Sequence, residues 1–385
     1  MEGEQEVLKV MFSVGEASGD LHGGRVAREL KQNIPDIEMF GMGGQTMREA
    51  GVDICYDIAD LGVIGVAEVI KNLPRFFKLR DDLGRLMDER KPDVVVVIDY
   101  ADFNMRLAKV AKDKGIPVVS YISPSAWLWR KGRAKTVAKN TARVAAIFPM
   151  EAKVYEEAGA NVTFVGHPLL DIVKPTRTKE EAYRHYGADS ASPIVLLLPG
   201  SRLQEINSLL PPMLEAAETI AQRIPNVQFY LPLAPTVPDE LVAPMLERVN
   251  INVNCTRDGV HDLMQIATMG IAASGTVTLE AAILEMPMVV VYKVAKLTYW
   301  IGRVVLDLPN YSLPNIVGGR RIVPELIQHE ANPERIVSES MKLLEDDAYY
   351  RQMKEGLADV RRRLGEGGAV AKVARVIEEV GNKEK

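Results

Sequence analysis

Cysteine is almost missing from this chain, which has only Cys55 and Cys255 among its 385 residues. The two lie far apart and neither belongs to a CxxC pair, so the sequence predicts a reduced, cytosolic protein with two incidental thiols. Histidine is also scarce, and the five histidines are scattered without the spacing of a metal site. We therefore expect no metal centre and no disulfide framework.

Long hydrophobic runs are missing as well. The longest purely apolar runs, such as Val94–Ile98 and Ile194–Leu198, fall far short of the roughly 20 residues that cross a bilayer. The acidic N-terminus, MEGEQEVLKV, does not resemble a signal peptide. A basic excess is absent too, because the net charge is -5, which argues against a nucleic-acid binder as a whole. These absences leave a soluble protein, or one that lies on a membrane surface.

Short β-branched runs alternate with longer amphipathic stretches along the whole chain. Continuous apolar strands separated by helices are typical of a parallel sheet that is covered on both faces. In the first half, the expected strands are Val7–Val14, Ile37–Gly41, Val94–Asp99, Val118–Ile122, Val144–Phe148 and Val162–Val165. In the second half, they are Ile194–Leu198, Val227–Leu231, Ile251–Cys255, Gly270–Ala273 and Met288–Tyr292.

The two series of strands predict an α/β protein with two Rossmann-like domains that face each other across a cleft. A polar stretch from Gly166 to Pro193, interrupted by proline, separates them. We expect an N-terminal domain over 1–168, a linker over 169–193 and a C-terminal domain over 194–363. A C-terminal helix over 364–385 is expected to cross back and pack on the N-terminal domain. Ligands bind at the carboxyl ends of such strands, so the site is expected there.

A glycine-rich turn, VGEASGDLHGG at Val14–Gly24, follows the first strand. It matches neither the G-x-G-x-x-G of dinucleotide sites nor the G-K-[ST] of a P-loop. Asp20, at the mouth of the next helix, would repel the pyrophosphate that a helix N-terminus attracts. Two interpretations stay open here: a ligand-binding loop, or a plain strand-to-helix turn with Ser18 or Asp20 as N-cap.

An aspartate ends the strand of VVVVIDYADFN. Asp99 closes this expected strand, and Asp102 and Asn104 follow it. A carboxylate at this edge of a sheet faces the cleft, where it is placed to accept a proton from a substrate hydroxyl. The D-x-x-D spacing would also suit a metal, but no histidine or third carboxylate accompanies it. We favour Asp99 as a functional residue, with Asp102 as a helix N-cap in the alternative.

Two turns in the second half suit a phosphate. LLLPGSR brings Arg202 to the start of a helix, where its guanidinium suits diphosphate oxygens. AASGTVTLEAA forms a turn at Ser274, Gly275 and Thr276 that opens another helix, whose free backbone N–H groups are able to cradle phosphate. Glu280 lies about one turn into that helix, where its carboxylate is placed to accept both hydroxyls of a ribose. The alternative is a capped helix with a surface glutamate.

Two further stretches mix apolar or aromatic residues with basic ones. Leu61–Leu83 has apolar residues at helical spacing, which suits either a membrane interface or the protein core. Those residues are Val63, Val66, Val69, Ile70, Leu73, Phe76 and Phe77. The segment YISPSAWLWRKGRAK places two tryptophans beside a basic patch of Arg130, Lys131 and Arg133. Such a pattern suits a phosphorylated sugar, a lipid headgroup layer or a solvated helix face.

Seven motifs together resemble those of one family, the lipid-A-disaccharide synthases, which are inverting GT-B glycosyltransferases. They are GEASGD, IDYADFN, YISPSAWLW, FVGHPLLD, LLPGSR, ASGTVTLE and YSLPNIVGGRRIVPELIQ, which occur in the family's order from Gly15 to Gln328. The resemblance implies that UDP-2,3-diacylglucosamine and 2,3-diacylglucosamine 1-phosphate condense to a β-1,6-linked disaccharide 1-phosphate and UDP, in lipopolysaccharide biosynthesis of Gram-negative bacteria.

The resemblance also implies roles for the residues. Asp99 would be the base on the acceptor hydroxyl, and Glu280 the ribose anchor. Arg202, the Ser274–Thr276 turn and Asn315 would hold the departing UDP. The acceptor-side loop would comprise Glu16, Ser18, Asp20 and Asp102. The apolar stretch would lead acyl chains from the membrane into the cleft, and the basic patch would meet a phosphate or anionic lipid.

The implied enzyme needs no cofactor or metal, binds no nucleic acid, and lies peripherally on the cytoplasmic face of the inner membrane. The sequence leaves open whether it forms a homodimer. Two alternatives remain at this point, a UDP-sugar 2-epimerase of the same fold and a non-catalytic, two-lobed solute-binding protein. An NAD-dependent dehydrogenase is disfavoured by the broken glycine fingerprint.

Overall fold

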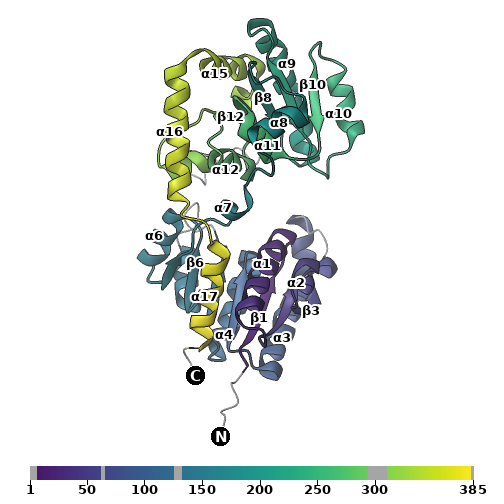
Figure 1. Ribbon diagram of the computed structural model, residues 1–385. Coiled ribbons are helices and arrows are strands. Elements are labelled where there is room, and N and C mark those ends of the chain that lie inside the picture. The colour runs from purple at the N-terminus through teal and green to yellow at the C-terminus, as the bar shows by residue number, and fades with distance from the viewer. Residues whose placement is uncertain (1–6, 62–65, 125–131, 294–309, 383–385) are drawn as a thin grey trace. The chain divides into compact units, whose positions relative to one another are not determined.

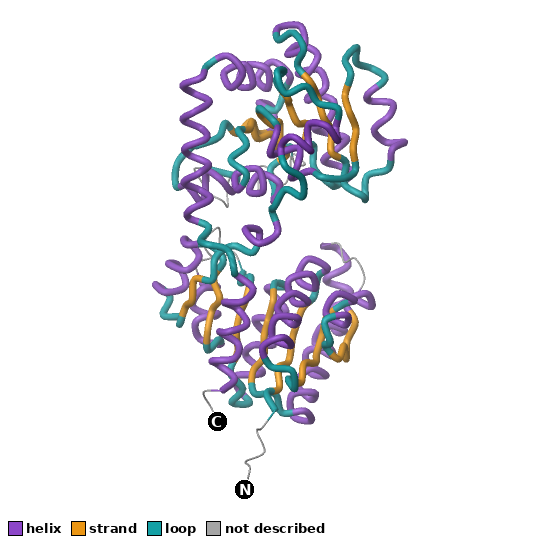
Figure 2. Tube along the Cα trace, viewed as in Figure 1, coloured by secondary structure: helices purple, strands orange, loops and turns teal. Residues whose placement is uncertain are grey.

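The computed structural model describes residues 7–61, 66–124, 132–293 and 310–382, and gives the backbone alone for residues 60–61 and 66–73. By their contacts, these residues form two compact units (Figure 1). Unit 1 comprises Met1–Pro168 and Glu366–Lys385, and unit 2 comprises Leu169–Gly365. In each unit, helices surround a single sheet, as the tube in Figure 2 shows.

Unit 1 contains a seven-stranded parallel sheet in the order β3-β2-β1-β4-β5-β6-β7. Its strands are β1 (Lys9–Val14), β2 (Glu38–Gly43), β3 (Asp53–Asp57), β4 (Val94–Ile98), β5 (Val118–Tyr121), β6 (Arg143–Ala146) and β7 (Val162–Phe164). Its helices are α1 (Ala17–Asn33), α2 (Gln45–Glu49), α3 (Val66–Arg90), α4 (Ala101–Asp113), α5 (Gly132–Asn140), α6 (Pro149–Glu157) and α17 (Ala369–Asn382), with a 3-10 turn, η1 (Ile58–Leu61).

The centre of this sheet is apolar on both faces. β4 reads VVVVI, and all of its residues are buried between β1 and β5, as a central parallel strand requires. On one face, α3 and α4 close a core that includes Met11, Leu83 and Leu107. On the other face, the C-terminal helix α17 packs against α1 and against β4, β5 and β6. The last helix of the chain is therefore part of unit 1.

Unit 2 contains a six-stranded parallel sheet in the order β10-β9-β8-β11-β12-β13. Its strands are β8 (Ile194–Leu198), β9 (Gln228–Pro232), β10 (Val253–Thr256), β11 (Met269–Ala273), β12 (Met288–Tyr292) and β13 (Glu325–Ile327). Its helices are α7 (Leu169–Ile172), α8 (Lys179–Tyr186), α9 (Leu203–Arg223), α10 (Asp239–Leu246), α11 (Val260–Ile266), α12 (Thr276–Ile283), α14 (Leu313–Gly318), α15 (Pro333–Glu345) and α16 (Asp347–Arg363), with a 3-10 turn, η2 (Gln328–Glu330).

The α/β fold with two parallel sheets is confirmed, and each sheet has one edge strand that the sequence analysis lacks. β3 reads DICYD and has no fully buried residue, so its sequence does not resemble a buried strand. β13 has only three residues, too few for a periodic signal. Both strands are held by pairing with a longer neighbour, β2 and β12 respectively.

Residues 169–193, expected as a linker, are folded into unit 2. They contain α7 and α8, and α8 begins with a capping box in which Thr178 and Glu181 each accept the other's backbone N–H. The buried carboxylate of Asp262, on α11, holds the turn that precedes α8. It accepts hydrogen bonds from the Thr176 and Arg177 backbone N–H groups at 2.6 and 3.0 Å, and it pairs with the Arg177 guanidinium at 2.7 Å.

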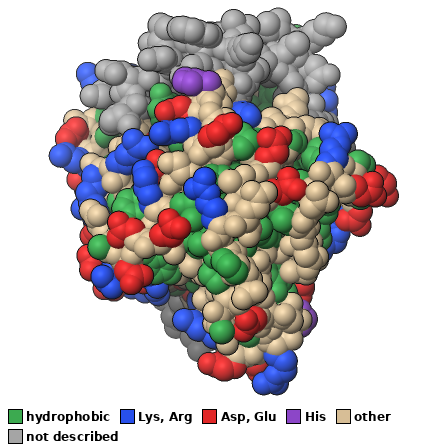
Figure 3. Space-filling model, turned by 90° about the horizontal axis from the view of Figure 1, so that it is seen from above, with side chains coloured by type: hydrophobic (Ala, Val, Ile, Leu, Met, Phe, Trp, Pro, Cys, Tyr) green, Lys and Arg blue, Asp and Glu red, His purple; other side chains and the backbone are tan. Residues whose placement is uncertain are grey.

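On the face shown in Figure 3, acidic and basic side chains are interspersed, with small groups of hydrophobic side chains between them. None of the helices within the described ranges is long and apolar enough to span a bilayer.

Candidate functional site

A cavity of about 440 Å³ lies at the carboxyl ends of the strands in unit 2. In that sheet the strand order reverses between β8 and β11, and ligands of doubly wound folds bind at such a switch point. The cavity is lined by Leu198, Gly200, Ser201, Arg202, Glu205, Pro232, Leu233, Ala234, Pro235, Arg257, Asp258, Gly259, Val260, Ala273, Ser274, Gly275, Thr276, Val277 and Glu280. Five of the six predicted donor-binding residues therefore meet in one cavity that unit 2 forms by itself.

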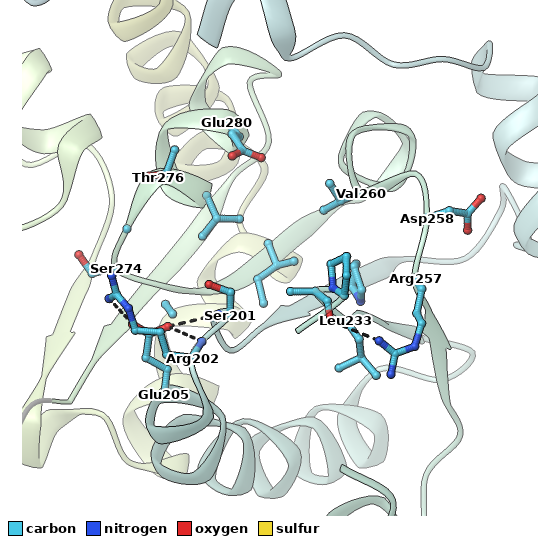
Figure 4. A pocket seen from close by; sticks show the side chains of 18 of the residues that line it. Ser201, Arg202, Glu205, Leu233, Arg257, Asp258, Val260, Ser274, Thr276 and Glu280 are labelled. Atoms are coloured by element: carbon cyan, nitrogen blue, oxygen red, sulfur yellow. Dashed lines mark hydrogen bonds and ion pairs between the residues drawn. The ribbon is translucent and has the colours of Figure 1, made fainter. Parts of the chain in front are cut away.

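Arg202 lies on one side of this cavity, at the N-cap of α9 (Figure 4). Gly200, just before it, has φ +103°, a conformation that glycine adopts at least cost. The Glu205 carboxylate accepts the Ser201 and Arg202 backbone N–H groups at 3.2 and 3.3 Å, and it pairs with the Arg202 guanidinium at 3.0 Å. The Arg202 side chain remains 83% exposed, so most of its five N–H donors stay open to an anion.

Ser274, Gly275 and Thr276 form a second part of the cavity wall, where β11 ends and α12 begins, and Ser274 lies near Arg202 (Figure 4). The first backbone N–H groups of a helix have no partner within it, and they carry a partial positive charge. Together with Arg202, this wall provides donors and positive potential but no carboxylate at the turn itself. The arrangement suits a ligand with two linked phosphates.

Glu280 lies one turn into α12, with its side chain beside the cavity (Figure 4). Its Oε2 atom lies 3.0 Å from Nε2 of His261, on α11. His261 belongs to no motif in the sequence, and the spacing of the histidines gives no sign of this contact. Within the described residues, no group of three or more potential metal ligands comes together.

Two segments of the cavity wall carry no motif and were also missed. One is residues 232–235 at the end of β9, and the other is residues 257–260 after β10. Leu233 and Val260 give this wall apolar surface, and the guanidinium of Arg257, which also lines it, donates to Val237 O at 2.9 Å and to the Asp239 carboxylate at 2.5 Å. The wall suits a flat, partly apolar group such as a nucleobase. Its only signal in the sequence is its place after two strands.

Asn315, the sixth predicted donor-binding residue, does not line the cavity. It is fully buried, and its side-chain amide donates to Val323 O at 2.9 Å and to Glu325 at 2.8 Å. Its side-chain oxygen accepts the backbone N–H groups of Ile322 and Val323 at 2.7 and 2.9 Å. All of its polar capacity is used to fix the segment after α14, and its predicted role in holding the ligand stays a prediction.

Asp99 lies at the corresponding switch point of unit 1, directly after β4. It has φ +53°, and the next residue, Tyr100, also has positive φ. Asn104 fixes this corner, because its side chain donates to Asp99 O at 2.7 Å while accepting the Ser13 hydroxyl at 2.6 Å. Burial raises the pKa of the Asp99 carboxyl, although the Tyr100 backbone N–H opposes the shift. A carboxyl with a raised pKa is a stronger base once it is ionised.

The glycine-rich turn after β1 lies against this corner. A Cβ on Gly15 would come within 2.1 Å of the Tyr100 ring, and one on Gly19 would come within 2.8 Å of the Val14 side chain. Glycine therefore allows the turn to pack closely against Tyr100, the residue after Asp99. Burial, and then the charge of Asp99, raise the pKa of Glu16, while Ser18 is exposed. Glu16 thus lies near the corner, and Ser18 lies in the same turn, between Gly15 and Gly19.

Asp20 is an exception within the predicted acceptor-side loop. It is buried, and its carboxylate accepts the backbone N–H groups of Gly44, Thr46 and Met47 at 2.7, 2.8 and 3.2 Å. These groups begin α2, whose own N-cap residue, Gly44, has no side chain to cap them. Asp20 therefore shapes the loop from within, and its oxygens are occupied by backbone N–H groups.

Asp102 is in the first turn of α4 and is 84% exposed. Its carboxylate pairs with Arg133, the one member of the predicted basic patch within the described residues, at 2.6 Å. Arg130 and Lys131 lie outside the described residues.

The predicted apolar stretch is described only in part. Val63 lies outside the described residues, as do the side chains of Val66, Val69, Ile70 and Leu73. The two aromatic residues of the stretch differ in exposure. Phe76 packs inward against Tyr100 and Phe103, with ring centroids 6.4 and 6.5 Å apart. Phe77 is 40% exposed, and the Arg80 and Arg106 guanidinium groups lie 5.2 and 5.5 Å from its ring centroid.

Comparison with solved structures shows the fold. The chain resembles the glycotransferase of kitacinnamycin with a TM-score of 0.66 and 17% identity, over 97% of this chain and 98% of that one. It resembles UDP-GlcNAc 2-epimerase from Neisseria meningitidis bound to UDP-GlcNAc with a TM-score of 0.64 and 15% identity, over 97% and 100% of the two chains.

Comparison with sequences is more specific. Residues 10–374 match the family of lipid-A-disaccharide synthetases. The chain is 43% identical to the lipid-A-disaccharide synthase of Geobacter sulfurreducens and 38% identical to that of Myxococcus xanthus, in each case over 97% of both chains. The motifs, the cavity at the switch point of unit 2 and these relatives agree: the chain belongs to the lipid-A-disaccharide synthase family.

Proposed function

We propose that the protein is an inverting glycosyltransferase that joins UDP-2,3-diacylglucosamine to 2,3-diacylglucosamine 1-phosphate. The bond between the donor's anomeric carbon and the UDP oxygen breaks, and UDP leaves with the electron pair. The acceptor's 6-hydroxyl oxygen bonds to that carbon from the opposite side, which converts the α-linked donor into a β-1,6-linked disaccharide 1-phosphate. The observation that carries the proposal is the cavity of unit 2, which unites Arg202, the Ser274–Thr276 turn and Glu280 in a chain of this family.

In this proposal the cavity holds the UDP part of the donor. Arg202 and the N-terminus of α12 bind the diphosphate and stabilise the charge that grows on it as the bond breaks. Glu280 accepts the ribose hydroxyls, and the wall that contains Leu233 and Val260 contacts the base. Since the positive groups come from the protein, the step needs no metal ion.

Asp99 is the proposed general base on the acceptor's 6-hydroxyl. Its carboxylate takes the proton as the new bond forms, which keeps the attacking oxygen nucleophilic without a free alkoxide. The raised pKa supports this role, since a more basic carboxylate accepts a proton more readily. Glu16 and Ser18, beside the same corner, are proposed to lie on the acceptor side.

We also propose that unit 1 contacts the cytoplasmic face of the inner membrane peripherally. Both substrates carry acyl chains, and Phe77 offers an exposed ring between two guanidinium groups, which suits an anionic lipid surface. Phe77→Ser should reduce co-sedimentation with vesicles that contain anionic lipid. Equal sedimentation of both proteins would argue against a role for this ring.

The test of the proposed function is UDP release in the presence of each substrate alone and of both together. We expect UDP to be released only when the acylated donor and the acylated acceptor are both present. UDP-GlcNAc serves as the control for an epimerase, a function that the shared fold alone does not support. Conversion of UDP-GlcNAc to its 2-epimer, with no transfer between the glycolipids, would reject the proposal.

A further inference from the structure

One histidine outside the sequence motifs lies against the proposed donor site. His261 is in the first turn of α11, after Gly259, whose positive φ turns the chain into the helix. Its Nε2 atom is 3.0 Å from Oε2 of Glu280, and each of the two side chains is 21% exposed. The pair joins α11 to α12, so two separate helices fix one carboxylate.

The contact has a direction. An ionised carboxylate only accepts hydrogen bonds, so Nε2–H of His261 donates and Oε2 of Glu280 accepts. Glu280 lines the cavity but His261 does not. His261 therefore lies behind the carboxylate as seen from a ligand, and it acts on a ligand through Glu280.

Holding Glu280 in this way matters because a free glutamate side chain has several rotamers to lose when it binds a ligand. The histidine occupies one lone pair of Oε2, and a carboxylate has about four, so the others are left for a ligand in the cavity that Glu280 lines (Figure 4). Two adjacent hydroxyls on a ribose need an acceptor in a fixed position, and preorganisation of that acceptor lowers the entropy lost on binding.

We infer that His261 is a positioning residue that holds the Glu280 carboxylate for the hydroxyl groups of the donor's ribose. This inference rests on the proposed donor site. It assigns to α11 a part in recognising the ribose, in addition to the wall that Val260 contributes.

The test compares the affinities of UDP and 2′-deoxy-UDP, measured by calorimetry on the full chain. The two ligands share the base and the diphosphate, so the ratio of their dissociation constants isolates one ribose hydroxyl. In His261→Ala we expect that ratio to fall about fivefold, the size of one net hydrogen bond. In His261→Gln, the amide N–H is able to replace Nε2–H, so we expect a ratio of dissociation constants close to that of the unchanged protein. At saturating donor, kcat should stay close to that of the unchanged protein.

Gln265→Ala is the matched control, because Gln265 is on the same helix but donates to Arg177 O at 3.0 Å. It loosens α11 without touching Glu280, so it should leave the ratio unchanged. If the unchanged protein prefers UDP and Glu280→Gln removes the preference while His261→Ala keeps it, the inference is overturned and the donor site stands. If the unchanged protein binds both ligands equally, the ribose anchor itself is wrong, and the inference fails with it.

Discussion

Asp99→Asn removes the proposed base with little change to the structure around it. The residue has φ +53°, which asparagine tolerates better than most residues, whereas alanine would add backbone strain. The bonds that fix the corner involve the backbone, namely Asp99 N to Tyr121 O at 3.3 Å and the Asn104 side chain to Asp99 O at 2.7 Å. The substitution leaves both of them in place.

A general base contributes about 10²- to 10⁴-fold to a rate, which equals roughly 3–5 kcal/mol of activation free energy. We therefore expect kcat of Asp99→Asn to fall by about that factor in a UDP-release assay with both glycolipids. The affinity for UDP should change less than about twofold, because the residues proposed to hold UDP belong to unit 2 and Asp99 belongs to unit 1. A variant that folds, binds UDP and turns over at near-normal rate would remove Asp99 from this role.

The pH dependence provides a second readout of the same residue. The base must be ionised, so kcat/KM should fall as the pH drops through the pKa of Asp99, which burial raises above the usual value for aspartate. The charge of Asp99 adds to burial in raising the pKa of Glu16, whereas burial alone raises the pKa of Asp99. Glu16→Gln should therefore leave the acid limb of the profile in place. A limb that moves to lower pH would show that the two carboxyls titrate as a coupled pair.

Three further predictions concern the donor site and the loop. Arg202→Ala should weaken UDP binding about 10- to 100-fold in calorimetry, which corresponds to the free energy of a charge-assisted hydrogen bond. Unchanged binding would exclude contact with the diphosphate. Chelation by EDTA should leave the rate of UDP release unchanged, since protein groups neutralise the diphosphate, and a loss restored by added Mg²⁺ would contradict that. Asp20→Ala should lower the free energy of unfolding, measured in urea, by about 2–3 kcal/mol, because three backbone N–H groups lose their acceptor. Asp20→Asn should have a stability between those of Asp20→Ala and the unchanged protein. Equal stability of all three would contradict the capping role.

The sequence predicts the central strands well because they are buried and continuously apolar. β4 and β8 are examples, and in both every residue is buried. The edge strands β3 and β13 escape prediction because pairing with a neighbour, and not their own composition, holds them in the sheet.

Some site residues are likewise predictable from the sequence, and others are not. Arg202 and Glu280 are predictable because a strand, a turn and a helix start place them at a sheet edge. Asp20 and Asn315 are also polar, but their polar atoms bond to the backbone within the fold, and sequence alone does not reveal such partners. His261 carries no local motif, because its partner is on another helix.

The central claim is tested most directly by the structure of the product that forms from the α-linked UDP-2,3-diacylglucosamine and 2,3-diacylglucosamine 1-phosphate. Mass spectrometry gives its composition, and proton NMR gives the configuration and position of the new linkage. We predict a β-1,6-linked disaccharide 1-phosphate, in amounts equal to the UDP released. An α-linked disaccharide, or a sugar product without the second glycolipid, would contradict the claim.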